Sequence, residues 1–214
     1  MKIFLLTTMF CFSCATCAAQ SESIHKLSSR LSVTPTAGLV FSTFVGSGAE
    51  NSSIRVGLTT GLEMTFQTDN LFGYSTGVSY CQLGALEERT TYGLISRLDY
   101  INVPLLLNLR LSKRTYAPIL KTGVRLGFLV GAKFSDDMGS IQPDNGLSAN
   151  DLFKTFDCSI PISLSWNFNR FVIGASYVFG LLDIVNKPAT IYGIPYHNDS
   201  VHLISLETHV GYRL

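Results

Sequence analysis

The sequence predicts an all-β fold, an eight-stranded antiparallel up-and-down transmembrane β-barrel with short periplasmic turns and long extracellular loops. Three observations predict it. Apolar and polar residues alternate along eight segments, which is the period of a strand with one apolar face. Only 14% of the residues are charged and 46% are hydrophobic, a balance that suits a surface facing lipid. The connections between the segments alternate between long and short, as in barrels of the bacterial outer membrane.

The beginning of the chain is expected to lie outside the barrel. Residues 1–19 combine an early lysine, an apolar run and a small-residue end, which is the order of a secretory signal peptide. Residues 20–30 are expected to form a short periplasmic lead-in, and residues 31–214 the outer-membrane barrel domain. A lipidated cysteine, Cys14 or Cys17, is the alternative for this leader, although the residues before both cysteines fit that motif poorly.

The strand pattern is clearest in the second segment, where even positions hold Ile, Val, Leu, Met and Phe and odd positions hold Arg, Gly, Thr and Glu. The third sets Phe, Tyr and Val against Gly and Ser, and the fifth sets Leu, Val and Phe against Lys, Gly and Arg. The sixth, seventh and eighth repeat an aliphatic and aromatic face, while the first and fourth follow the rule less cleanly. In chain order, the strands are expected at residues 31–44, 54–66, 72–81, 95–111, 118–132, 156–166, 171–181 and 204–214.

The polar faces indicate a barrel with lipid outside and a narrow interior. They consist of Gly, Ser and Thr with isolated charges, which suits a lumen that only side chains can fill. The short connections fall around residues 68–70, 112–116 and 167–170, on the expected periplasmic side. The long connections are expected to form extracellular loops at residues 45–53, 83–94, 133–154 and 182–199.

Charged and polar residues on the inner faces are the first candidate site. Buried charges need partners, so these side chains are expected to pair into a plug in preference to lining a conducting path. The first and last strands must pair for closure, which is expected to bring Glu207 and His209 beside Thr36 and Gly38. By strand parity, the residues of this interior network are Arg55, Glu63, Lys121, Arg125, Glu207, His209 and Arg213.

No catalytic, cofactor-binding or metal-binding residue is predicted. Ser205 and His209 share a strand face, but four residues at about 3.3 Å each separate them by roughly 13 Å, too far for a hydrogen bond. A serine from a neighbouring strand could replace Ser205, so a lipid-modifying enzyme stays as an alternative. The acidic residues around Asp136 and Asp144 lack the spacing of an EF-hand loop. With 16 Lys and Arg against 15 Asp and Glu, charge gives no reason to expect nucleic acid as a partner.

The fourth segment carries a motif, Leu98-Asp99-Tyr100-Ile101-Asn102-Val103-Pro104-Leu105-Leu106-Leu107. It resembles a strand of the PorT-like outer-membrane β-barrel family, which belongs to the outer membrane protein beta-barrel domains. Tyr100, Val103 and Pro104 are the residues that match the motif. The resemblance implies an eight-stranded outer-membrane barrel without catalytic residues, whose founding member takes part in the secretion of exported proteins.

Three features of this chain depart from the expected pattern. The sequence ends in Leu214, where outer-membrane barrels usually have a terminal Phe. Parity places Asp99 toward lipid, so it is expected at the membrane interface or beside a register shift. Pro104 falls on the inward face, where a proline normally requires a local bulge.

The sequence therefore predicts a non-enzymatic integral protein of the bacterial outer membrane, which needs no cofactor. Its expected role is that of an anchor, a surface-interaction protein or a component of secretion machinery, acting through the extracellular loops. The expected partners are outer-membrane lipid and, through the loops, other envelope or secretion proteins. A small pore or transporter for small or apolar molecules, and the lipid-modifying enzyme, are the alternatives.

Overall fold

The computed structural model describes most of the barrel domain. The described residues are 31–47, 49, 52–68, 71–89, 92–112, 117–136, 139–141, 143, 146, 148–186, 189–191, 194–196 and 200–214. The signal peptide predicted at residues 1–19 and the lead-in predicted at residues 20–30 lie outside them.

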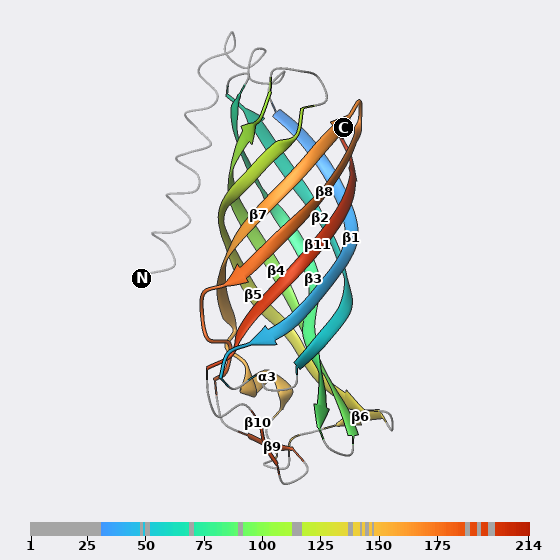
Figure 1. Cartoon of the computed structure of the whole chain (residues 1–214), viewed down its shortest axis with the longest axis vertical. Helices are drawn as coiled ribbons and strands as arrows, with labels where there is room; N and C mark the ends of the chain where they lie inside the picture. Colours follow the sequence, from blue (N-terminus) through green and yellow to red (C-terminus); the bar gives the residue numbers. More distant parts are fainter. Residues whose placement is uncertain are drawn as a thin grey trace, which may run out of the picture.

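Eight long antiparallel strands close into a barrel (Figure 1), which confirms the predicted fold class. Each long strand pairs with the next along the chain, and β1 pairs with β11 to close the sheet. The long strands are β1 (Leu31–Val45), β2 (Ser52–Gln67), β3 (Phe72–Arg89), β4 (Tyr92–Arg110), β5 (Ile119–Asp136), β7 (Phe156–Phe168), β8 (Phe171–Gly180) and β11 (His202–Tyr212).

Short elements lie at one end of the barrel, opposite the C terminus (Figure 1). Strand β6 (Gly139–Ile141) pairs with the end of β5, and β9 (Ala189–Ile191) forms a hairpin with β10 (Ile194–Tyr196). A single helical turn, α3 (Ala149–Leu152), also lies there. Because the short connections lie at the other end, this end is the extracellular one by the rule for outer-membrane barrels. It is called the outer end below.

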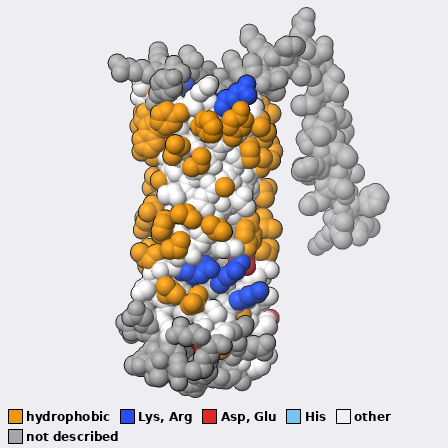
Figure 2. All heavy atoms as spheres, turned by 90° about the vertical axis from the view of Figure 1, so that its right-hand side faces the viewer, with side chains coloured by type: hydrophobic (Ala, Val, Ile, Leu, Met, Phe, Trp, Pro, Cys, Tyr) orange, Lys and Arg blue, Asp and Glu red, His pale blue; other side chains and the backbone are white. Residues whose placement is uncertain are grey.

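The outer wall of the barrel is apolar. Val56, Leu58, Leu105 and Leu107 each expose more than half of their surface. Figure 2 shows hydrophobic side chains along the length of the wall. A soluble monomer rarely exposes so large an apolar surface, whereas a wall that contacts lipid requires one. The described part of the chain contains no helix of the length and apolar character that a bilayer-spanning helix needs.

One predicted connection is wrong. Residues 83–94 are not a long loop, because β3 continues to Arg89 and β4 begins at Tyr92. The side chains of Leu83, Leu94 and Leu98 point into the barrel and are buried. Their burial explains why the two strands stay ordered beyond the lipid-facing part of the wall. The loop predicted at residues 133–154 also begins later, since β5 extends to Asp136.

Two register shifts interrupt the sheet, and neither is at Pro104. One separates Ile54 from Thr59 in the pairing of β2 with β3, beside Gly84 with its φ of 139°. The other lies between Asp99 and Tyr100 in the pairing of β4 with β5. Opposite Pro104, the β3–β4 ladder has a gap, but the register is the same on both sides of it. The bulge expected at Pro104 is therefore absent. The missing N–H of the proline interrupts the pairing of β3 with β4 but does not shift its register.

Replacement of Gly84 by alanine is expected to destabilise the barrel. A φ of 139° is accessible to glycine alone, and a Cβ there would overlap the carbonyl oxygen of Ser96. The conformational strain alone is worth about 1–3 kcal/mol. Urea unfolding in detergent micelles measures the loss. Gly93→Ala is the matched control, since a Cβ at Gly93 meets no atom within 4 Å. Equal stability of the two variants would contradict this account of the bulge.

Candidate functional site

A charged belt crosses the middle of the lumen. It consists of two ion pairs: Lys121 with Glu63 at 2.5 Å, and Arg125 with Glu207 at 2.5 Å. Lys121 and Arg125 are four residues apart on β5 and therefore share its inner face. Their partners come from β2 and β11, so the two pairs connect opposite parts of the wall. Both cations are only 5% exposed.

Hydroxyl and amide groups complete the hydrogen bonding of the belt. Thr65 donates to Glu63 at 3.0 Å, and Ser205 donates to Glu207 at 3.1 Å. The Nε of Arg125 donates to Ser159 at 3.2 Å. The network continues through Ser75, which accepts from Asn108 at 2.6 Å and contacts Thr65 at 2.9 Å. Buried charges are tolerated when they are paired and hydrogen-bonded in this way.

The other residues predicted for the interior network lie in different places. His209 faces the belt, and its register partner on β1 is Gly38, as predicted, whereas Glu207 lies opposite Val40. Arg213 lies nearer the periplasmic end, in the vestibule described below. Arg55 is not in the belt. Its Nη1 donates to the carbonyl oxygens of Leu83 at 3.0 Å and Gln82 at 3.4 Å, at the register shift between β2 and β3.

The motif residues of β4 are structural neighbours of the belt. Tyr100 is 2% exposed and points inward, where its hydroxyl has no hydrogen-bond partner among the described residues. Pro104 lines a small cavity of about 90 Å³ within the belt. Val103 is half-buried on the outer face. In the described part of the chain, no side-chain hydrogen bond joins these three residues to the charged residues, although Pro104 is the ladder partner of Arg125.

The belt lacks the geometry of a hydrolytic site. In the described residues, no serine hydroxyl is hydrogen-bonded to His209, and Ser205 donates to Glu207 instead. A nucleophile needs its base within hydrogen-bond reach. Across the same described ranges, no group of three His, Cys, Asp or Glu side chains is placed to hold a metal ion.

An apolar core fills the outer half of the lumen, where sequence reasoning expected small polar residues. Phe44, Leu98 and Phe134 contribute from the wall, while Phe153 and Ile184 contribute from the loops. The ring centroid of Phe153 lies 6.4 Å from that of Phe44 and 5.9 Å from that of Phe134. The residues of this outer core are Val40, Phe44, Cys81, Leu83, Ala85, Leu94, Leu98, Tyr100, Ala132, Phe134, Leu152, Phe153, Ile184, Ile191, Val201 and Leu203.

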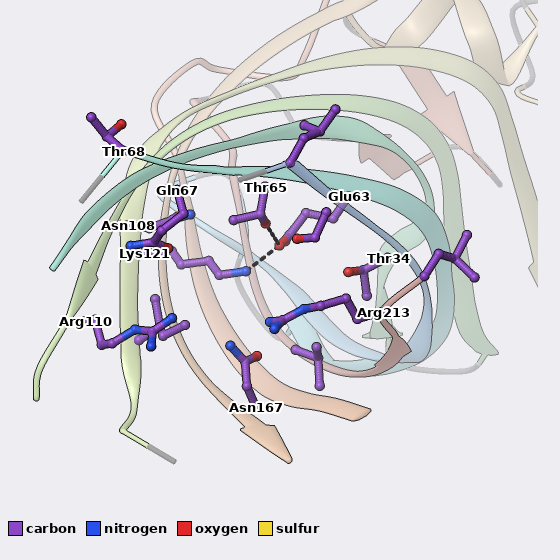
Figure 3. Close-up of a pocket in the computed structure, with 15 residues that line it drawn as sticks. Thr34, Glu63, Thr65, Gln67, Thr68, Asn108, Arg110, Lys121, Asn167 and Arg213 are labelled. Atoms are coloured by element: carbon purple, nitrogen blue, oxygen red, sulfur yellow. Dashed lines mark hydrogen bonds and ion pairs between the residues drawn. The ribbon is translucent and has the colours of Figure 1, made fainter. Parts of the chain in front are cut away.

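Within the described residues, the periplasmic end of the lumen contains a cavity. A cavity of about 590 Å³, the periplasmic vestibule, lies on that side of the belt and is lined by Glu63, Lys121, Arg110 and Arg213 among others (Figure 3). The Nε atoms of Arg110 and Arg213 are buried without a partner in the described residues. The lumen therefore changes along its axis from a polar vestibule, through the charged belt, to the outer core.

The apolar wall, the charged belt and the outer core together define the class of protein: a transmembrane β-barrel with a filled lumen. The chain belongs to the family described as outer membrane protein beta-barrel domain, whose profile matches residues 18–186. Members of that family are β-barrels of the bacterial outer membrane. Among proteins of curated function, none has a sequence that matches this chain.

Several solved structures are similar to this chain. Neisserial surface protein A is 13% identical to this chain with a TM-score of 0.50, and the match covers 85% of this chain and 97% of that one. Ail, the attachment invasion locus protein of Yersinia pestis, is 17% identical with a TM-score of 0.47, covering 86% and 99% of the two chains. OprG of Pseudomonas aeruginosa is 12% identical with a TM-score of 0.41, covering 86% and 96%. The likeness to Neisserial surface protein A, at 13% identity, concerns the fold alone.

Removal of one partner of the Arg125–Glu207 pair is expected to destabilise the barrel strongly. Arg125→Met leaves the Glu207 carboxylate buried without its cation, which costs about 3–5 kcal/mol. The double variant Arg125→Met with Glu207→Gln removes the uncompensated charge and should recover much of that loss. The apparent free energy of unfolding in urea and micelles measures both effects.

Lys154→Met is the matched control for this prediction. Lys154 pairs with Asp183 at 3.3 Å, but both side chains are at least one-third exposed, so the loss should be about 0–1 kcal/mol. If Arg125→Met were as stable as Lys154→Met, the belt would not be a buried structural network.

Proposed function

We propose that the protein is a closed, non-enzymatic outer-membrane barrel whose outer end is a preformed interaction surface. The observation that carries the proposal is the outer core, in which loop residues pack against side chains of the barrel wall. Loops held in one conformation lose little entropy when they bind a partner. The protein would therefore act as an anchor or surface-interaction protein. A part in secretion machinery, as the PorT-like resemblance implies, is the more specific form of the same proposal.

Backbone hydrogen bonds support the idea of a fixed outer surface. The connection that contains α3 and the connection after β8 are joined by the N–H of Lys154, which donates to the carbonyl of Ile184 at 2.7 Å. The N–H of Asn186 donates to the carbonyl of Leu152, also at 2.7 Å. Asn150 accepts from the N–H of Ala132 at 2.6 Å, which ties the helical turn to β5. These contacts join two long connections to each other and to the wall.

Asp183 fixes the connection between β8 and β11. Its Oδ1 accepts from the N–H groups of Val201 at 3.0 Å and Val185 at 3.2 Å, while its Oδ2 accepts from Lys154. Partial burial opposes ionisation, but these donors outweigh it and hold the pKa of Asp183 below its ordinary value. The ionised carboxylate is therefore part of what holds this connection in place.

A filled lumen argues against the pore alternative. Ions would have to pass both the paired charges of the belt and the apolar side chains of the outer core. Purified protein in planar bilayers is therefore expected to give no single-channel current. A steady, reproducible current from the wild-type chain would contradict the closed-barrel proposal and favour the pore.

The interaction surface is tested by photo-cross-linking from Asn186, an exposed residue at the outer end. In intact cells, we expect defined adducts from this position, and we expect Phe153→Ala to abolish them because it loosens the packing of the loops. The same cross-linker at Arg170, in a periplasmic turn, is the control position. Unchanged heat-modifiability on gels would show that the Phe153→Ala barrel still folds. Adducts that persist in a folded Phe153→Ala barrel would contradict a role for the preformed surface.

Acid is expected to loosen the same connection. Because the folded pKa of Asp183 is lowered, its contribution is complete above the unfolded pKa of about 3.9 and is lost as pH falls through the lower folded value. Pepsin cleavage between residues 181 and 201 measures this in wild type and in Asp183→Ala. The ratio of the variant's cleavage rate to that of wild type should be greatest near pH 5 and approach one in stronger acid. A ratio independent of pH would contradict the assigned role.

A further inference from the structure

Two cations lie side by side on the lipid-facing side of the barrel. Arg97 of β4 and Lys133 of β5 are register partners, and both are on the outer face of the sheet. Like charges at directly opposed positions of an antiparallel pair repel each other. Negative charge close to both side chains would relieve this repulsion.

The pair lies where the exposed apolar residues of β3 and β4 end. Along β3 and β4, Val78 and Ile101 are the last exposed apolar residues before the outward side chains become polar. Toward the outer end they are followed by Tyr80, Gln82, Asp99 and Arg97. Figure 2 shows Lys and Arg side chains gathered in the part of the wall nearer the outer end, with hydrophobic side chains on both sides of them. Because the apolar band of an outer-membrane barrel ends at the membrane interface, we infer that this level lies in the headgroup region of the outer leaflet.

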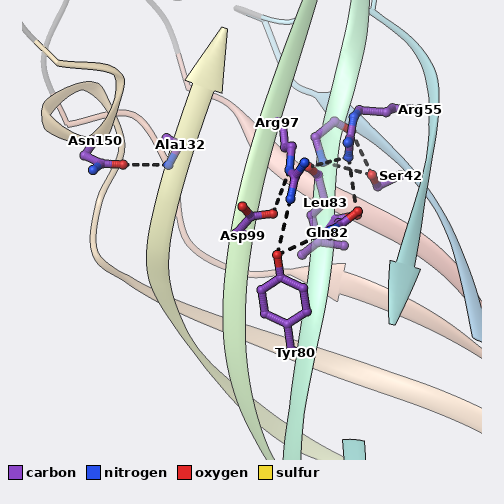
Figure 4. Close-up of polar contacts among 10 residues, drawn as sticks. Ser42, Arg55, Tyr80, Gln82, Leu83, Arg97, Asp99, Ala132 and Asn150 are labelled. Carbon is purple, nitrogen blue, oxygen red and sulfur yellow. Dashed lines mark hydrogen bonds and ion pairs between the residues drawn. The ribbon is translucent and has the colours of Figure 1, made fainter. Parts of the chain in front are cut away.

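A third cation joins the pair at the register shift between β2 and β3. Arg55 lies between these strands, anchored to the carbonyl oxygens of Gln82 and Leu83, and it is close enough to Arg97 and Asp99 to interact with them electrostatically (Figure 4). Its guanidinium lies at the interrupted part of the β2–β3 ladder, where these two carbonyl oxygens accept its hydrogen bonds. Arg55, Arg97 and Lys133 are called the basic cluster below.

One carboxylate is too little to neutralise the basic cluster. Arg97 Nε donates to Asp99 Oδ1 at 3.0 Å, and its Nη2 donates to the Tyr80 hydroxyl at 3.4 Å. Among the described outward-facing side chains at this level of β2 to β5, Asp99 is the one acidic group. Three cations and one anion leave a net charge of +2 (3 − 1) at the membrane surface.

We propose that the basic cluster binds the phosphate group of an outer-leaflet lipid. A guanidinium presents paired N–H donors that match phosphate oxygens, and an ammonium beside it adds a point charge. Clusters of Lys and Arg at a membrane surface recognise anionic lipid headgroups. The phosphate would lie between Arg97 and Lys133, relieve their mutual repulsion and hold this side of the barrel at a fixed depth. The proposal does not depend on the function proposed above.

Binding is tested with full-length protein in phosphatidylcholine vesicles that contain a fluorescent lipid A bearing phosphomonoesters. Each cation at a membrane surface contributes about a fivefold gain in affinity. Arg97→Gln with Lys133→Gln should therefore weaken lipid A binding about 25-fold. Asp99→Asn, which removes the competing carboxylate, should strengthen it. Arg170→Gln removes an exposed cation at the periplasmic end and should leave it unchanged.

The remaining arms separate the possible sources of phosphate. Dephosphorylated lipid A should bind the wild-type protein no more tightly than phosphorylated lipid A binds the double variant. Inorganic phosphate should not displace the labelled lipid at concentrations that leave the vesicles intact. Equal lipid A binding by wild type and the double variant would overturn the proposal and leave Arg97–Asp99 as a structural pair. Full competition by inorganic phosphate would also overturn it, in favour of a site for soluble anions.

Discussion

A backbone N–H or C=O group that faces hydrocarbon must find its partner within the protein, and the pairing of β1 with β11 provides the last of those partners. The register runs from Thr36 opposite Gly211 to Val45 opposite His202, so none of the eight long strands described is left with a free edge. The strands approach closely at Gly38, where any Cβ would overlap the carbonyl oxygen of Thr208. Closure with eight strands leaves a lumen so narrow that side chains must fill it. The packing of side chains inside the barrel follows from the narrowness of this lumen.

The lumen is filled in two chemically different ways. In the middle, where lipid surrounds the wall, the charged belt binds strands β2, β5 and β11 together through buried ion pairs. Toward the outer end, apolar side chains from wall and loops form a core like that of a soluble protein. The first arrangement holds the barrel together from within, and the second holds the loops on the barrel. A fixed outer surface and a closed passage are therefore two consequences of one packing arrangement.

The local part of this structure was predictable from sequence, and the non-local part was not. Alternation with a period of two located all eight long strands. Closure brought His209 beside Gly38, as predicted, but Glu207 lies opposite Val40 and not beside Thr36. The same alternation misled at residues 83–94, because there the inner face is apolar, as at Leu83 and Leu94, whereas in the middle of the barrel it is polar. The position of the Arg55 side chain depends on the register shift between β2 and β3. The vestibule depends on which charged side chains from different strands form ion pairs. Neither feature can be predicted from the pattern of one strand.

The central claim is that β1 and β11 close a filled barrel in the membrane. Hydrogen–deuterium exchange of the protein in lipid vesicles tests it most directly, because amides paired in hydrocarbon exchange slowly. The account predicts that residues 36–45 and 202–211 are protected as strongly as the residues that pair β7 with β8. Rapid exchange confined to those two segments would show an open sheet and would contradict it.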